Sequence, residues 1–300
     1  MNKIKRAFLC ALLSAGILFS LSSCGEKKQQ DLLPLELDVP TVAAESAPTD
    51  QNAARYEIPS SVPAEQIAPN GKKIKASRAL KIYKKAVDGL KSRSPGFTLM
   101  QWQDLKNIDT ADSTGILNSI LSIVSKSLIR HNSAAEAQAE PEIIAAGDGV
   151  AAAEKLPLFG IGIEYSLTDN RDFITEARIV KADTYTEYYI FFAPELNPVS
   201  GGLGMGSLMS PFNRASIIEA AGTYIPTVDR DSLRLDCIYS GCYLMFRVGK
   251  DGKLLHLENH MYARIEAEAQ VNLIVVSAEL LNGSCSYEEH YIYSDFNYNT

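Results

Sequence analysis

Three of the four histidines in this 300-residue chain alternate with glutamates, a pattern that could bind a metal ion. His256, Glu258 and His260 occupy every second position of one segment, and Glu288 and His290 repeat the spacing further on. In a β-strand such positions share a face, so two imidazoles and a carboxylate could bind one cation such as zinc. His256 and His260 would be roughly 13 Å apart along an extended strand, so one ion would require a bend or a ligand from a neighbouring strand. The candidate ligands are His256, Glu258, His260 and His290, and the alternative is a solvated strand face that binds nothing.

A second unusual segment is rich in glycine and contains Gly201, Gly202, Gly204 and Gly206. Glycine-rich turns between a strand and a helix can bind phosphate through backbone N–H groups. This segment lacks the Lys-Ser/Thr pair of a P-loop and a parallel βαβ setting, so we expect a mobile gate loop at the rim of a sheet. The chain also lacks a nucleophile elbow and an HExxH motif, so we predict no catalytic residue and no cofactor.

Strands must position these residues, because apolar and polar residues alternate through most of the region 156–300. The clearest alternation runs from Lys253 to Val271 and has the histidine segment on its polar side. Lys250-Asp251-Gly252 predicts a hairpin with the segment 242–248, and Ser240-Gly241 predicts another turn, from the segment 233–239. Further strands are predicted at 159–167, 173–182, 185–193, 273–281 and 287–296.

The region 72–132 is predicted to be helical. Apolar residues recur at helical spacing between Lys75 and Lys91, and a second such pattern covers 112–131. Between these helices, 97–105 is expected to form a short helix or turn with Trp102 in the core. Helices followed by strands without βαβ alternation favour an α+β fold, in which N-terminal helices pack on a curved antiparallel β-sheet as in a half-barrel.

The N-terminus has a basic start, then an apolar run of about 15 residues, which is shorter than the roughly 20 that a membrane-spanning helix needs. The run leads into Leu21, Ser22, Ser23, Cys24 and Gly25. This string resembles the lipobox of bacterial lipoproteins. The resemblance implies that residues 1–23 are a signal peptide and that Cys24 becomes the lipidated N-terminus. The alternative is an ordinary secretory signal, since the two serines also fit a small-residue cleavage site.

Three regions are expected after the signal peptide. Residues 24–71 contain many prolines and no apolar period, which predicts a disordered linker behind the lipid anchor. Residues 72–300 are predicted to form a single α+β domain, with a helical part (72–132), a loop (133–155) and an antiparallel sheet (156–300). The net charge of −7 and the envelope location argue against a nucleic-acid partner.

Three cysteines remain after the lipidated position: Cys237, Cys242 and Cys285. An oxidising compartment favours one disulfide and one free thiol among them. If Ser240-Gly241 forms a two-residue turn, Cys237 faces Leu244, so a bridge from Cys285 to either of the other two is as plausible as a local one.

These observations predict a protein of the cell envelope that is anchored by lipid at Cys24, in the outer membrane of a Gram-negative bacterium. The strand-rich domain with its helical lead is loosely similar to envelope lipoproteins of the LolA and LppX kind, which implies an open half-barrel that holds a lipid. We therefore expect a non-catalytic binding module for an apolar ligand or a protein partner. The alternatives are a metal-dependent envelope enzyme that uses the His256 strand, and a structural interaction protein.

Overall fold

The computed structural model describes residues 63–110, 131, 133–147, 169–199, 202–209, 230–273 and 276–298, and scattered positions between 211 and 223. All of them belong to one compact unit, Ile58–Thr300. The signal peptide, Cys24, the linker up to residue 62, the predicted strand over 159–167 and, apart from its last residue, the predicted helix over 112–131 lie outside the described residues. In the part that is described, no helix is long and apolar enough to cross a membrane.

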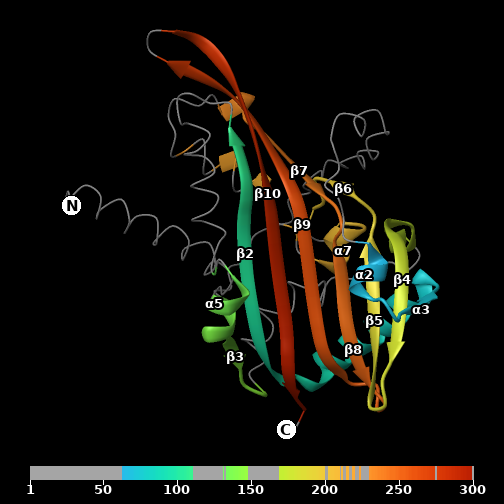
Figure 1. Ribbon diagram of the computed structural model, residues 1–300. Coiled ribbons are helices and arrows are strands. Elements are labelled where there is room, and N and C mark those ends of the chain that lie inside the picture. The colour runs from blue at the N-terminus through green and yellow to red at the C-terminus, as the bar shows by residue number, and fades with distance from the viewer. Residues whose placement is uncertain are drawn as a thin grey trace, which may run out of the picture. The chain divides into compact units, whose positions relative to one another are not determined.

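Most of the described residues form one antiparallel sheet with the strand order β1-β4-β5-β8-β9-β10-β2-β3 (Figure 1). The strands are β1 (Lys72–Ile74), β2 (Gly96–Thr110), β3 (Glu142–Ile144), β4 (Ile174–Lys181), β5 (Tyr185–Phe192), β6 (Glu195–Leu196), β7 (Arg234–Tyr239), β8 (Tyr243–Gly249), β9 (Leu254–Leu273) and β10 (Val276–Asn297). Among the described residues, β1 pairs only with β4 and β3 only with β2, so the sheet is open. With a few helices beside this sheet, the predicted α+β class is confirmed in its general form.

The period-two pattern located most of these strands correctly. The predicted strands 173–182, 185–193, 233–239, 242–248 and 253–271 correspond to β4, β5, β7, β8 and β9. The separate strands at 273–281 and 287–296 are wrong, because residues 276–281 and 287–296 belong to the one continuous strand β10, and Leu273 is the last residue of β9. The turn-like residues between them, Asn282 to Ser286, stay extended because they pair with residues 268–264 of β9.

The segment 97–105 is also a strand, so the expected short helix or turn is wrong. It belongs to β2, which pairs with β10 from Gly96 to Thr110. Phe97 and Leu99 are buried and alternate with half-buried Thr98 and Met100, which is the pattern of a strand with one face against a core. Trp102 lies on the same side as Met100, opposite to the buried pair.

The predicted turn at Ser240-Gly241 is instead a break within one long strand. Strands β7 and β8 do not form a hairpin, because both pair antiparallel with consecutive parts of β9. At the break, the Ser240 N–H donates to the Tyr262 carbonyl (3.0 Å), and the Tyr262 N–H donates to the Cys242 sulfur (3.3 Å). Gly241 has a φ of 69°, which glycine adopts readily and which lets the strand bulge. The thiol thus replaces one hydrogen bond of the sheet.

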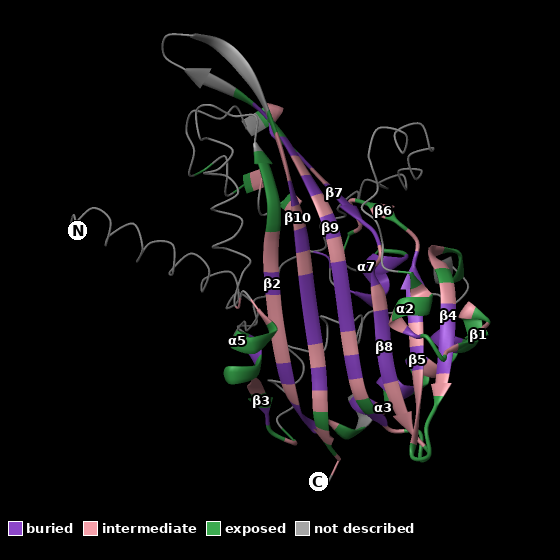
Figure 2. Cartoon of the chain, viewed as in Figure 1, coloured by how far each residue is buried: buried purple, intermediate pink, exposed green. Residues whose placement is uncertain are grey.

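The alternation along the strands gives the sheet two different faces, which appear in Figure 2 as alternating buried and half-buried bands. The core face carries side chains that are fully or almost fully buried, among them Phe246, Leu257, Met261, Ile265 and Tyr293. The other face carries His256, Glu258, His260, Tyr262 and Arg264 of β9, and we call it the histidine face.

Helix α3 (Ala76–Arg93) packs on the core face and confirms the helix predicted between Lys75 and Lys91. Its buried residues recur at helical spacing, and the ring of Tyr83 meets that of Phe246 edge-on at 5.2 Å between centroids. The other described helical segments are short: α2 (Ala64–Ile67), α5 (Ala134–Ala139), α7 (Met205–Leu208), η3 (Asp169–Phe173) and η4 (Arg230–Ser232). Helix α5 and strand β3 lie within the predicted loop 133–155.

Arg178 of β4 holds α2 beside the sheet. Its guanidinium is buried, forms ion pairs with Glu65 of α2 and Glu176 of β4, and donates to the Ala68 carbonyl (3.2 Å). The last part of the predicted linker 24–71 is therefore ordered, because its residues 64–68 are attached to β4 before β1 begins.

Candidate functional site

Five aromatic rings form a row across the middle of the histidine face, one from each of five neighbouring strands. In spatial order the ring row consists of Trp102 (β2), His290 (β10), His260 (β9), Tyr243 (β8) and Phe191 (β5). The successive centroids are 4.6, 5.0, 4.4 and 5.9 Å apart. The strand register fixes this row, because each of these residues is paired directly with the next.

A chain of hydrogen bonds crosses the ring row at its centre. Glu258 joins two histidines of its own strand, with Oε1 at 2.7 Å from His256 Nε2 and Oε2 at 2.8 Å from His260 Nε2. His260 Nδ1 then lies 2.8 Å from Nδ1 of His290 on the next strand. We call these four residues the histidine chain. The alternating residues of β9 can join in this way because their side chains point to one face.

The surroundings of Glu258 and His290 fix the charges of these two residues at neutral pH. Burial raises the pKa of Glu258, but hydrogen bonds from His256 and His260 outweigh this effect and bring it to about 2. Burial, together with the nearby His260 and Lys106, lowers the pKa of His290 to about 3. Glu258 is therefore a carboxylate and His290 a neutral imidazole.

Charged side chains surround the ring row on both sides. On one side, Lys106 Nζ contacts Glu288 (2.8 Å) and Asp104 (3.2 Å), and Glu288 Oε2 lies 3.8 Å from His290 Nε2. On the other, Arg247 pairs with Glu187 at 2.8 Å. Burial is also the main cause that raises the pKa values of Tyr243 and Tyr262, so both phenols stay neutral.

The four candidate metal ligands are neighbours, but they do not form a metal site. Among the described residues, no three His, Cys, Asp or Glu side chains could hold one ion. The reason is that Glu258 binds both histidines of its strand, and the remaining nitrogen of His260 faces His290. The prediction of a metal site is wrong, and the geometry identifies these residues as a hydrogen-bonded chain.

The disulfide prediction is also wrong, since Cys237, Cys242 and Cys285 are free and buried. Cys237 and Cys285 both pair with Ile265, from opposite sides of β9, so a full strand separates them. Cys242 bonds to the backbone of Tyr262 at the strand break. Burial raises the pKa values of Cys242 and Cys285 to about 12, so these thiols are poor nucleophiles.

The described part of the expected gate loop packs tightly against its neighbours. Gly206 is buried in α7, where a side chain would collide with the Val199 carbonyl. The Met205 N–H donates to the Glu195 carboxylate (2.6 Å). Gly202 and Gly204 are also described, and Gly201 lies outside the described residues. Gly204 and Gly206 therefore permit close packing beside β6.

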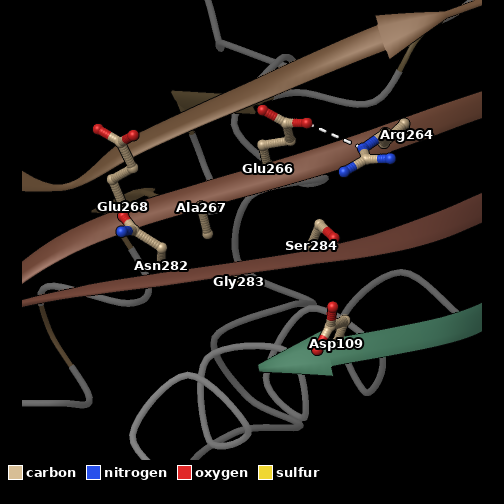
Figure 3. Close-up of a pocket in the computed structure, with 8 residues that line it drawn as sticks. All are labelled: Asp109, Arg264, Glu266, Ala267, Glu268, Asn282, Gly283 and Ser284. Carbon is tan, nitrogen blue, oxygen red and sulfur yellow. Dashed lines mark hydrogen bonds and ion pairs between the residues drawn. The ribbon is translucent and has the colours of Figure 1, made fainter. Parts of the chain in front are cut away.

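A pocket of 290 Å³ lies on the histidine face at the end of β2 (Figure 3). It is lined by Asp109, Arg264, Glu266, Ala267, Glu268, Asn282, Gly283 and Ser284. The Arg264 guanidinium pairs with Glu266 (2.8 Å), and the remaining carboxylates give the lining a polar, acidic character that does not suit an apolar ligand.

Sequence reasoning missed Trp102 and Tyr243 as partners of the histidines. The period-two alternation in 97–105 would have placed Trp102 on a strand, but its pairing with His290 depends on the order of the strands. Nothing in the sequence indicates that β2 lies beside β10.

We compared the chain with protein-family models, with curated proteins and with solved structures, and no match was found.

Proposed function

We propose that this protein is a lipid-anchored lipoprotein of the bacterial cell envelope and a non-catalytic binding module whose histidine face docks a protein partner. The observation that carries the proposal is the ring row of this face. Trp102 and Tyr243 are half-buried and the other three rings of the row are buried, and paired charges lie on both sides of the row. Protein interfaces commonly have this composition, with aromatic residues at the centre and a polar, charged rim.

The polar pocket favours a protein partner over an apolar ligand. One pocket that described residues outline is the acidic one of 290 Å³. Another pocket, of 240 Å³, lies beside α2 and is lined partly by Glu65, Glu176 and Phe191. An acyl chain would need a mostly apolar cavity, whereas paired charges around aromatic rings suit another protein surface.

The proposal includes the anchor and its place in the cell. The lipobox-like string supports acylation of Cys24 after removal of residues 1–23, in the outer membrane of a Gram-negative bacterium. Residues between Cys24 and α2 would act as the tether, which joins the sheet where Arg178 holds α2. We also propose that the sheet is a curved half-barrel with N-terminal helices on its core face. The contact of α3 with β8 supports this arrangement.

Site-specific photocrosslinking in intact cells tests the docking surface. A photoreactive amino acid replaces Met100, which is half-buried on the histidine face beside Ile292, or, as a control, exposed Lys81 of α3. We expect a discrete protein adduct from position 100 but not from position 81, and its loss in a Tyr243→Ser variant. Equal adducts from both positions, or none from position 100, would contradict docking on this face. A lipid that co-purifies with the chain and protects position 100 would favour the apolar-ligand alternative.

A further inference from the structure

Helix α2 stands beside one end of the ring row, on the same face of the sheet. The row ends at Phe191 of β5, and β4 follows as the next strand. Arg178, which holds α2, lies between Ala177 and Ile179 of the core face, so strand alternation directs its side chain to the histidine face. Helix α2 therefore forms a wall on the histidine face, next to the last ring of the row.

The pocket of 240 Å³ lies between this wall and the ring row. Ala64 lines it from α2, Pro194 from the segment after β5, and Gly241 from the break between β7 and β8. Phe191 lines it as well, and its ring packs against that of Tyr243 with the centroids 5.9 Å apart. The pocket is therefore continuous with the ring row, and we call it the end pocket.

The carboxylates and the threonine hydroxyl of the end pocket already have partners. Glu65 and Glu176 both form ion pairs with Arg178. The Thr175 hydroxyl donates to the Phe191 carbonyl (3.2 Å). An occupant therefore meets mainly the proline and aromatic surfaces of the lining, which favour an apolar group over a charged one.

The volume of the end pocket limits the size of its occupant. Pockets that hold a drug-sized ligand usually measure about 300–1,000 Å³, so a pocket of 240 Å³ is smaller than these. One large side chain, such as that of phenylalanine or leucine, is a better match in size. Side chains that fill a pocket at the surface of a partner are typical of the hot spots of protein interfaces.

We propose that the end pocket receives one large apolar side chain of the partner protein and is the hot spot of docking on the histidine face. This inference rests on the proposed function and specifies where the partner is bound most tightly. The ring row supplies the flatter part of the interface beside the pocket. A few anchor residues of this kind contribute most of the binding free energy in protein interfaces, while the contacts around them exclude water.

Filling the end pocket tests this assignment in the photocrosslinking assay with the reactive amino acid at position 100. Ala64→Trp fills the pocket from α2, and Pro194→Trp fills it from the segment after β5. Ala64→Ser and Pro194→Ala are the matched controls. We expect each tryptophan variant to lower the yield of the protein adduct about tenfold or more, and each control to stay within about twofold of the wild type. The two tryptophan variants alter different elements, so one still tests the pocket if the other does not fold.

The outcomes of this assay separate the end pocket from the docking function. An unchanged yield in the folded tryptophan variants would overturn the role of the pocket and leave docking on the histidine face intact. An equal fall in the tryptophan variants and their controls would also overturn it, because the effect would then not depend on filled volume. A wild-type chain that gives no adduct from position 100 contradicts the docking function itself, so the two failures can be told apart.

A titration of the purified full-length chain tests the end pocket without the partner. The probe is N-acetylphenylalaninamide, and N-acetylglycinamide, which lacks the ring, is the control. We expect the probe to shift the backbone NMR signals of Thr175 and Gly241 with a dissociation constant on the order of 1 mM. The control compound should leave these signals unchanged, and Pro194→Trp should abolish the shifts. Equal shifts with the two compounds, or none with the probe, would contradict a pocket for an apolar side chain.

Discussion

His290 lies between Trp102 and His260 on the histidine face, and its environment keeps it neutral. Burial, together with the nearby His260 and Lys106, lowers its pKa from 6.5 to about 3. The unfolded chain therefore binds one more proton than the folded chain between these values. This contribution to stability is complete above about pH 6.5 and is lost as the pH falls towards 3, by up to about 1.4 kcal/mol per pH unit.

We predict that His290→Phe, which keeps an aromatic ring beside Trp102, reduces this loss of stability on acidification. The measurement is the free energy of unfolding by urea at several pH values, with His131→Gln as the control. The pH slope of the variant should be smaller by about one proton. An unchanged slope would show that His290 titrates normally in the folded protein.

Asn259 presents a different case at the scale of a residue. It is fully buried on the core face between Leu244 and Tyr291, and no described group forms a hydrogen bond with either atom of its amide. A buried amide without partners costs about 1–3 kcal/mol. We therefore expect Asn259→Leu, which is similar in size, to raise the free energy of unfolding by about this amount in urea titrations. Destabilisation would mean that the amide has a partner in the working protein.

At the scale of elements, the contact between α3 and the sheet is the clearest test of the core. Tyr83 is fully buried and its ring packs against Phe246 of β8. We predict that Tyr83→Ala lowers the free energy of unfolding by about 3–5 kcal/mol, because it removes a large buried aromatic ring. Lys81→Ala on the exposed side of the same helix should change it by less than about 0.5 kcal/mol. Similar effects of the two changes in thermal or urea unfolding would contradict packing of α3 on the core face.

The sequence predicted local elements better than their pairing. Alternation located β9 and the helical spacing located α3, because both patterns reflect burial on one side. The turn predicted at Ser240-Gly241 was wrong. A turn signal cannot distinguish a hairpin from a bulge when a third strand, β9, pairs with both sides. The candidate site was predicted in part for the same reason. The neighbours on one strand, His256, Glu258 and His260, could be recognised, but the contacts to His290 and Trp102 depend on strand order.

At the scale of the whole molecule, the proposed lipid anchor at Cys24 would determine where the domain works. We predict that metabolic labelling with an alkyne fatty acid marks the wild-type protein, and that Cys24→Ala abolishes the label and releases the protein from the membrane fraction. Three other cysteines, Cys237, Cys242 and Cys285, are buried and should not be acylated. A Cys285→Ala variant is the matched control and should keep its label. Labelling that survives Cys24→Ala would contradict the lipoprotein assignment.

Docking on the histidine face is the central claim, and the chain's single tryptophan gives the most direct measurement of it. Trp102 is half-buried at one end of the ring row. Hydroxyl-radical footprinting with mass spectrometry can compare its oxidation in intact envelopes with that in the purified chain, with the exposed side chain of Leu203 as an internal reference. We predict that Trp102 is protected in the envelope and reactive in the purified protein, while Leu203 reacts equally in both. Equal oxidation of Trp102 in the two samples would contradict a partner on this face.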